Sequence, residues 1–93
     1  EAGMSQSEKL INRLLSMPKD FTVDELDAVF GRLGFVKRQR GRTSGSAIEY
    51  YDPKTLKVFK IHSPHPGNTL KRYVLQAAVD FLRTNNLIKE DRA

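Results

Sequence analysis

Apolar residues recur at helical spacing near the start of the chain. They lie between Ser7 and Met17, and Pro18 follows directly. A proline cannot continue a helix, so the pattern predicts a short amphipathic helix over Ser7 to Met17. Its apolar stripe consists of Leu10, Ile11, Leu14 and Leu15.

A second helix is indicated by its start and end signals. Thr22 and Glu25 have the spacing of a capping box, in which each side chain accepts a hydrogen bond from the backbone N–H of the other residue. Phe21, just before the cap, is expected to pack on Leu26. Gly34 is expected to end the helix in the left-handed conformation. The predicted buried stripe is Leu26, Val29, Phe30 and Leu33.

After Gly34 the apolar period changes from helical spacing to alternation. Three strands are predicted, over Phe35 to Arg40, Ala47 to Tyr51 and Leu56 to His62. The turn residues Asp52-Pro53 separate the last two. Loops this short favour an antiparallel meander.

A last helix follows the sequence SPHPGN. Asn68 or Thr69 is expected to cap it, and Asn85-Asn86 to end it. The residues predicted to form its buried stripe are Leu70, Tyr73, Val74, Ala77, Ala78, Phe81 and Leu82.

The order of these elements predicts an α+β fold. Three strands in so short a chain cannot bury both faces of a sheet, so the helices are expected to pack on one face and leave the other open. Residues 7–93 are expected to form one domain. Residues 1–6 are expected to be a disordered start, in which Glu1-Ala2-Gly3 is a remnant of expression cloning.

Composition restricts the class of protein. The chain has 93 residues, of which 39% are hydrophobic, and its mean hydropathy is −0.51. No apolar run approaches the roughly 20 residues that a membrane helix needs, and no secretory leader is visible. Cysteine is absent, which excludes disulfides and thiol catalysis and fits a reducing cytoplasm.

The charge is basic and unevenly placed. The formal net charge is +5 and the pI about 9.8, which favours nucleic acid, an anionic membrane surface or an acidic protein as partner. The alternative is a solvated strand edge that Lys and Arg keep soluble. The basic residues gather in the middle of the chain, at Lys37, Arg38, Arg40, Arg42, Lys54, Lys57 and Lys60.

Alternation sorts the strand residues into two faces. Apolar side chains of the second and third strands point one way, toward the helices. The open face then carries Ala47, Glu49, Tyr51, Lys60 and His62. Such a surface can hold a phosphate, stack a base and move a proton, although an open sheet face is also simply polar in many proteins.

Two loops carry candidate chemistry. In the loop from Gly41 to Ser46, Arg42, Thr43 and Ser44 offer a guanidinium and hydroxyls, while Gly45 and Ser46 offer backbone amides for a phosphate. A hairpin loop uses the same residues. His62 and His65 lie close in sequence, but a zinc site needs three or four ligands, so no metal and no cofactor are expected.

The stretch TSGSAIEYYDPKTLKVFKIHSPHPGNTLKRYVL resembles the central part of HicA-type toxins of bacterial toxin–antitoxin pairs. The resemblance rests on Gly45-Ser46-Ala47, His65-Pro66-Gly67 and Thr69-Leu70-Lys71, in that order, and covers roughly Phe21 to Ile88. It implies a double-stranded-RNA-binding topology, helix–three strands–helix, here with an extra N-terminal helix.

The resemblance also implies a function. Members of the family cleave mRNA in the bacterial cytoplasm, without metal, and are silenced by a HicB-type antitoxin, expected here to be acidic. A catalytic histidine is expected after Gly-Ser, where this chain has Ala47. The resemblance and the residues together select His62, His65 and Glu49 for the chemistry. They select Arg38, Arg40, Arg42, Lys60 and Lys71, with the loop residues 43–46, for phosphate.

Two explanations of Ala47 stay open. In the first, the histidine of an active toxin was replaced by alanine. In the second, this branch of the family natively lacks the histidine, and it either relies on His62 or His65 or does not cleave RNA. The rival functions are an RNA-binding module without catalysis and a basic domain that docks an acidic protein. No membrane partner is expected.

Overall fold

The computed structural model shows an α+β fold that begins with three elements: α1 (Gln6–Leu15), α2 (Val23–Arg32) and β1 (Val36–Arg40). The later elements are β2 (Ala47–Tyr51), β3 (Val58–His62) and α3 (Arg72–Thr84). The structure describes residues 5–40, 47–64 and 67–88, except the side chain of Arg40. Within these ranges, no helix is both long enough and apolar enough to cross a bilayer.

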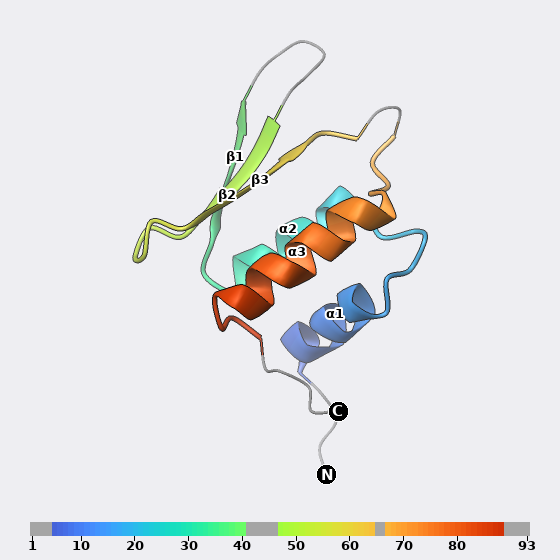
Figure 1. Cartoon of the computed structure of the whole chain (residues 1–93), viewed down its shortest axis with the longest axis horizontal. Helices are drawn as coiled ribbons and strands as arrows, with labels where there is room; N and C mark the ends of the chain where they lie inside the picture. The colour runs from blue at the N-terminus through green and yellow to red at the C-terminus, as the bar shows by residue number, and fades with distance from the viewer. Residues whose placement is uncertain (1–4, 41–46, 65–66, 89–93) are drawn as a thin grey trace.

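The three strands form an antiparallel sheet in the order β1-β2-β3. Helices α2 and α3 pack together on one face of the sheet, and α1 lies against both helices on the side away from the strands (Figure 1). The predicted layout of helix, three strands and helix, with an additional N-terminal helix, is therefore confirmed. The other face of the sheet carries no helix among the described residues.

The capping box predicted for α2 is present. Thr22 Oγ1 accepts from the backbone N–H of Glu25 at 3.2 Å, and Glu25 Oε1 accepts from the backbone N–H of Thr22 at 3.0 Å. Gly34 has the predicted left-handed conformation, with φ +93°. A second capping box, which the sequence reasoning missed, joins Ser5 and Glu8 and starts α1 at Gln6.

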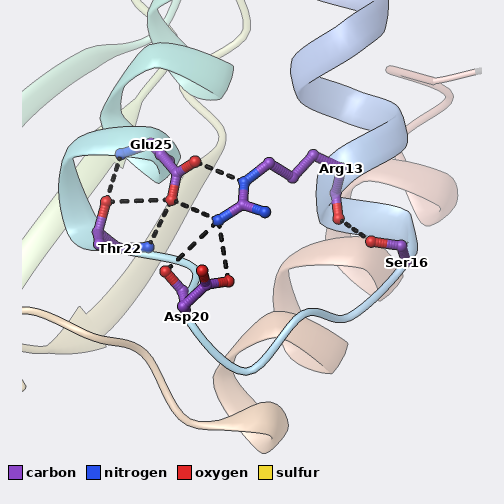
Figure 2. A network of polar contacts seen from close by, with 5 residues as sticks. All are labelled: Arg13, Ser16, Asp20, Thr22 and Glu25. Carbon is purple, nitrogen blue, oxygen red and sulfur yellow. Dashed lines mark hydrogen bonds and ion pairs between the residues drawn. The ribbon is translucent and has the colours of Figure 1, made fainter.

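Arg13 links the N-terminal helix to the start of α2 (Figure 2). Its Nε donates to Glu25 Oε2 at 2.6 Å and its Nη2 to Asp20 Oδ1 at 3.1 Å. The guanidinium also lies over the ring of Phe21, 5.6 Å from the centroid. The hydrogen bond from Arg13 holds the pKa of the Glu25 carboxyl below its ordinary value. Glu25 thus takes part in the capping box of α2 and also pairs with Arg13 of α1.

The core lies between the sheet and the α2–α3 pair. Phe30 is fully buried at its centre and stacks on Tyr50 at 4.5 Å and on Phe59 at 5.4 Å between ring centroids. The side chains that point inward from the strands are Ile48, Tyr50, Phe59 and Ile61, as the alternation predicts.

The start of α3 was predicted wrongly. The helix begins at Arg72, and Lys71 occupies the N-cap without a side-chain cap hydrogen bond. Asn68 and Thr69 instead pair with the entry to α2, where the Asn68 carbonyl accepts from Val23 N–H at 2.9 Å and Thr69 forms a β-bridge with Thr22. That pairing holds the segment extended, so the helix starts later.

The buried face of α3 is also rotated from the predicted one. Tyr73 is 71% exposed and Ala77 is exposed, whereas Leu75 and Val79 are buried. Both stripes have a period of 3.6 residues, so the period alone does not decide between them. The third strand is shorter than predicted, because Leu56 lies in the β2–β3 turn with φ +65°.

Candidate nucleic-acid interface

The open face of the sheet presents its side chains in three cross-strand rows. Partners directly opposite one another in an antiparallel sheet point to the same face, so the register defines each row. The middle row is Arg38, Glu49 and Lys60, and the row on one side of it is Val36, Tyr51 and Val58. On the other side Ala47 lies opposite His62.

The middle row is a set of ion pairs in which the carboxylate of Glu49 is buried and the two cations are exposed. Glu49 is only 6% exposed, although it belongs to the open face. Arg38 Nη2 donates to Glu49 Oε1 at 3.0 Å, and Lys60 Nζ lies 3.4 Å from Glu49 Oε2. The two cationic side chains keep 44% and 60% of their surface exposed. Solvent on this face therefore meets the cations and not the carboxylate.

Arg38 is further held by an aromatic ring. Its guanidinium carbon lies 4.2 Å from the centroid of Tyr51, within the range of a cation–π contact. A guanidinium has five N–H donors, of which one is used by Glu49. The side chain is thus fixed on one side and retains donors for an outside acceptor.

The row that contains Ala47 is where the family resemblance expects a catalytic histidine. Ala47 is half-buried and lies opposite His62, which is exposed at the end of β3. On its other side Ala47 pairs with Arg40 in the backbone register. An imidazole at position 47 would point to the same face as His62, from the neighbouring strand.

The third row is apolar. Val36 and Val58 are each 44% exposed and flank Tyr51. Leu56 is 74% exposed in the adjoining turn, which Asp52 closes by accepting from the backbone N–H of Lys54 at 2.9 Å. The open face therefore runs from an apolar end, through the cationic row, to the row of Ala47 and His62.

Lys37 belongs to the opposite face, although it lies in the basic stretch of the sequence. Its ammonium lies 2.9 Å from Asp27 Oδ2, and the Tyr50 hydroxyl donates to Asp27 Oδ1 at 2.6 Å. Burial, reinforced by Asp27, raises the pKa of the Tyr50 hydroxyl far above its ordinary value, so that it remains a donor. Lys37 thus anchors β1 to α2 and does not contribute to the open face.

A cleft of about 230 Å³ lies on this helix-facing side of the sheet. Its lining includes Lys37, Asp24 of α2 and Ser63, whose hydroxyl is buried without a hydrogen-bond partner among the described residues. Among the described residues of its lining, one is a cation and one an anion, and the cation is already paired with Asp27. The cleft therefore has no preference for an anionic ligand, and the open face remains the better candidate for RNA.

The remaining predicted site residues are distributed as follows. Lys71 is exposed at the N-cap of α3, which belongs to the helical layer and not to the open face. The predicted contacts of His65, of the Arg40 side chain and of Arg42, Thr43, Ser44, Gly45 and Ser46 lie outside the part of the chain that the structure describes. The sequence reasoning missed the burial of Glu49 and the contact of Arg38 with Tyr51. The signal for both was the register that places these residues opposite or diagonal to one another.

Comparison of the chain with protein-family models, with curated proteins and with solved structures found no match. The resemblance to HicA-type toxins therefore remains a prediction from the residues quoted for it.

Proposed function

We propose that this chain binds RNA through the open face of its sheet and is the toxin half of a bacterial toxin–antitoxin pair. The observation that carries the proposal is the middle row, where two cations are exposed above a buried carboxylate. The basic net charge and the adjacent row of Ala47 and His62 agree with it. RNA offers both the phosphates that such a row attracts and the bases that stack on exposed rings.

The proposed reaction is metal-independent cleavage of the RNA backbone. A base takes the proton of a 2′-hydroxyl, and the freed oxygen bonds to the adjacent phosphorus. An acid then gives a proton to the 5′-oxygen, which leaves, so that a cyclic phosphate and a free 5′-hydroxyl result. His62 is the candidate for one of these two roles. Position 47 is the place for the other, and its alanine has no proton to give or take.

Glu49 is a poor candidate for the base. Its carboxylate contacts both Arg38 and Lys60, and uptake of a proton would weaken both ion pairs. The chain as it stands is therefore expected to bind RNA and to cleave it slowly or not at all. A non-catalytic RNA-binding module is the second candidate function, and Ala47 is the observation that favours it.

The partner is proposed to be an acidic antitoxin that covers the same face. The opposite charges of the two proteins steer their association, and the bound antitoxin then covers the surface that RNA would contact. Mixing the two proteins should therefore reduce RNA binding, and the loss should be smaller at high salt. An antitoxin that binds while RNA affinity stays unchanged would place its contact on another surface.

The function is tested by incubating labelled RNA with the protein in the presence of EDTA. Slow cleavage that EDTA does not stop supports the toxin. Binding without cleavage is expected both of the module and of a toxin that lacks the histidine at position 47, and cleavage gained by Ala47→His then identifies the toxin. If the protein neither binds nor cleaves RNA at low salt, the toxin and the RNA-binding module are both excluded, and a domain that docks an acidic protein remains.

A further inference from the structure

The proposed function leaves Glu49 without a task, although its side chain is buried on the open face. A carboxylate that is 6% exposed loses most of its hydration, and folding tolerates this only where partners compensate. Arg38 and Lys60 both contact it, from the strands on either side. If the face needed only solubility, a neutral side chain here would avoid burying a charge.

The contacts of Arg38 restrict its guanidinium from two directions. Glu49 accepts from one Nη atom at 3.0 Å, and the ring of Tyr51 lies beneath the guanidinium plane at 4.2 Å. A free arginine samples many rotamers and loses this freedom when it binds a ligand. Held in this way, Arg38 has already lost much of that freedom in the unbound protein.

Resting on the proposed function, we propose that Glu49 is a positioning residue that orders Arg38, and secondarily Lys60, as a two-cation clamp for a backbone phosphate of RNA. Arg38 and Lys60 flank β2 from the two neighbouring strands, and their side chains are 44% and 60% exposed. A phosphate that lies above the row contacts both cations, while the carboxylate stays below them. Glu49 itself does not touch the RNA.

Two readings of Glu49 give opposite results. As a mere negative charge, it weakens RNA binding, so its neutralisation should strengthen binding. As a positioning residue, it strengthens binding, because ordering one long side chain at the moment of binding costs roughly 2- to 12-fold in affinity. The variants Glu49→Gln, which removes the charge, and Glu49→Asp, which keeps it but shortens the side chain, separate the two.

The experiment measures the affinity of a short single-stranded RNA oligonucleotide as a function of salt for each variant. We expect Glu49→Asp and Glu49→Gln both to weaken binding, by roughly 2- to 12-fold. Arg38→Ala should weaken it more and lower the salt slope by about 0.7, the value of one phosphate contact on a single strand. In the Arg38→Ala background the Glu49 variants should lose most of their effect. Arg32→Ala, on the last turn of α2, is the matched control and should change little.

A second measurement needs no RNA. The NMR order parameter of the Arg38 Nε–H group should be high in the unsubstituted protein and fall in Glu49→Asp, while thermal unfolding reports whether the fold is intact. A low order parameter in the unsubstituted protein would overturn the inference, even if the Glu49 variants fail to fold. Stronger binding by Glu49→Gln together with unchanged binding by Glu49→Asp would overturn it as well.

Failure of the proposed function would look different. If RNA does not bind the unsubstituted protein, the proposed function falls. The NMR comparison, repeated with inorganic phosphate as the probe, still decides whether Glu49 orders Arg38 for an anion. Shifts at Arg38 and Lys60 that weaken in Glu49→Asp support the clamp, and their absence overturns it.

Discussion

Replacing Ala47 with histidine tests the catalytic part of the proposal. Position 47 lies directly opposite His62, and Cβ atoms of such cross-strand pairs are about 4.5–5.5 Å apart. Two imidazoles at that separation can flank a single phosphate. Ala47 is half-buried, and no helix in the described part of the chain covers this face, so we expect the stability to change by no more than about 0.5 kcal/mol.

The expected gain follows from general acid–base catalysis. A positioned acid or base contributes about 10²–10⁴-fold to a rate, so Ala47→His should raise RNA cleavage by a factor in that range. An imidazole ordinarily changes charge between about pH 5 and 8, so the added activity should vary with pH in this interval. The protein should also become toxic to a host that lacks the antitoxin.

The assay follows a labelled RNA in the presence of EDTA, with two controls. Ala47→Gln offers similar bulk without a group that titrates, and should stay at background. Ala47→His combined with His62→Ala should lose most of the gain if the two imidazoles act together. Cleavage that remains at background in Ala47→His, while RNA affinity is unchanged, would refute the reasoning and favour the non-catalytic module.

Two further predictions concern the fold. Phe30→Ala should destabilise the domain by about 3–5 kcal/mol, because the ring is fully buried among aromatic neighbours. Tyr73→Ala should change the free energy of unfolding by no more than about 0.5 kcal/mol, because Tyr73 is exposed. Equal losses in urea unfolding would contradict the buried face that the structure gives to α3. The folded-state pKa of Glu25 is lowered, mainly by Arg13, so its contribution to stability is complete above the ordinary value of 4.5 and is lost as the pH falls through the folded value. Arg13→Gln should therefore flatten the dependence of the unfolding midpoint on pH below about 4.5, and an unchanged dependence would show that the pair contributes nothing.

The parts of the fold that the sequence predicted are those set by local chemistry. The capping box of Thr22 and Glu25, the left-handed Gly34 and the alternation in β2 depend on residues within a few positions of one another. The choice of which face of α3 is buried depends on residues far apart in the sequence. Tyr73 and Leu75 both fit an apolar stripe, and only the packing against the sheet and the pairing of Thr69 with Thr22 decide between them.

The candidate site divides in the same way. Alternation placed Glu49, Lys60 and His62 on the open face, and the structure agrees. The buried carboxylate of Glu49 is paired with Arg38, which is eleven positions earlier in the chain and opposite it in the sheet. A prediction of that burial requires the register of β1 against β2, and the sequence identifies no two-residue turn that would fix the register.

The most direct test of the central claim is an NMR titration of the protein with a short single-stranded RNA at low salt. If the open face binds RNA, the backbone amides of Arg38, Glu49, Lys60 and His62 should shift together. The amides of Gln76 and Asp80, on the exposed side of α3, should remain unchanged. Shifts confined to α3 and the N-terminal helix, with the strands unaffected, would contradict the account.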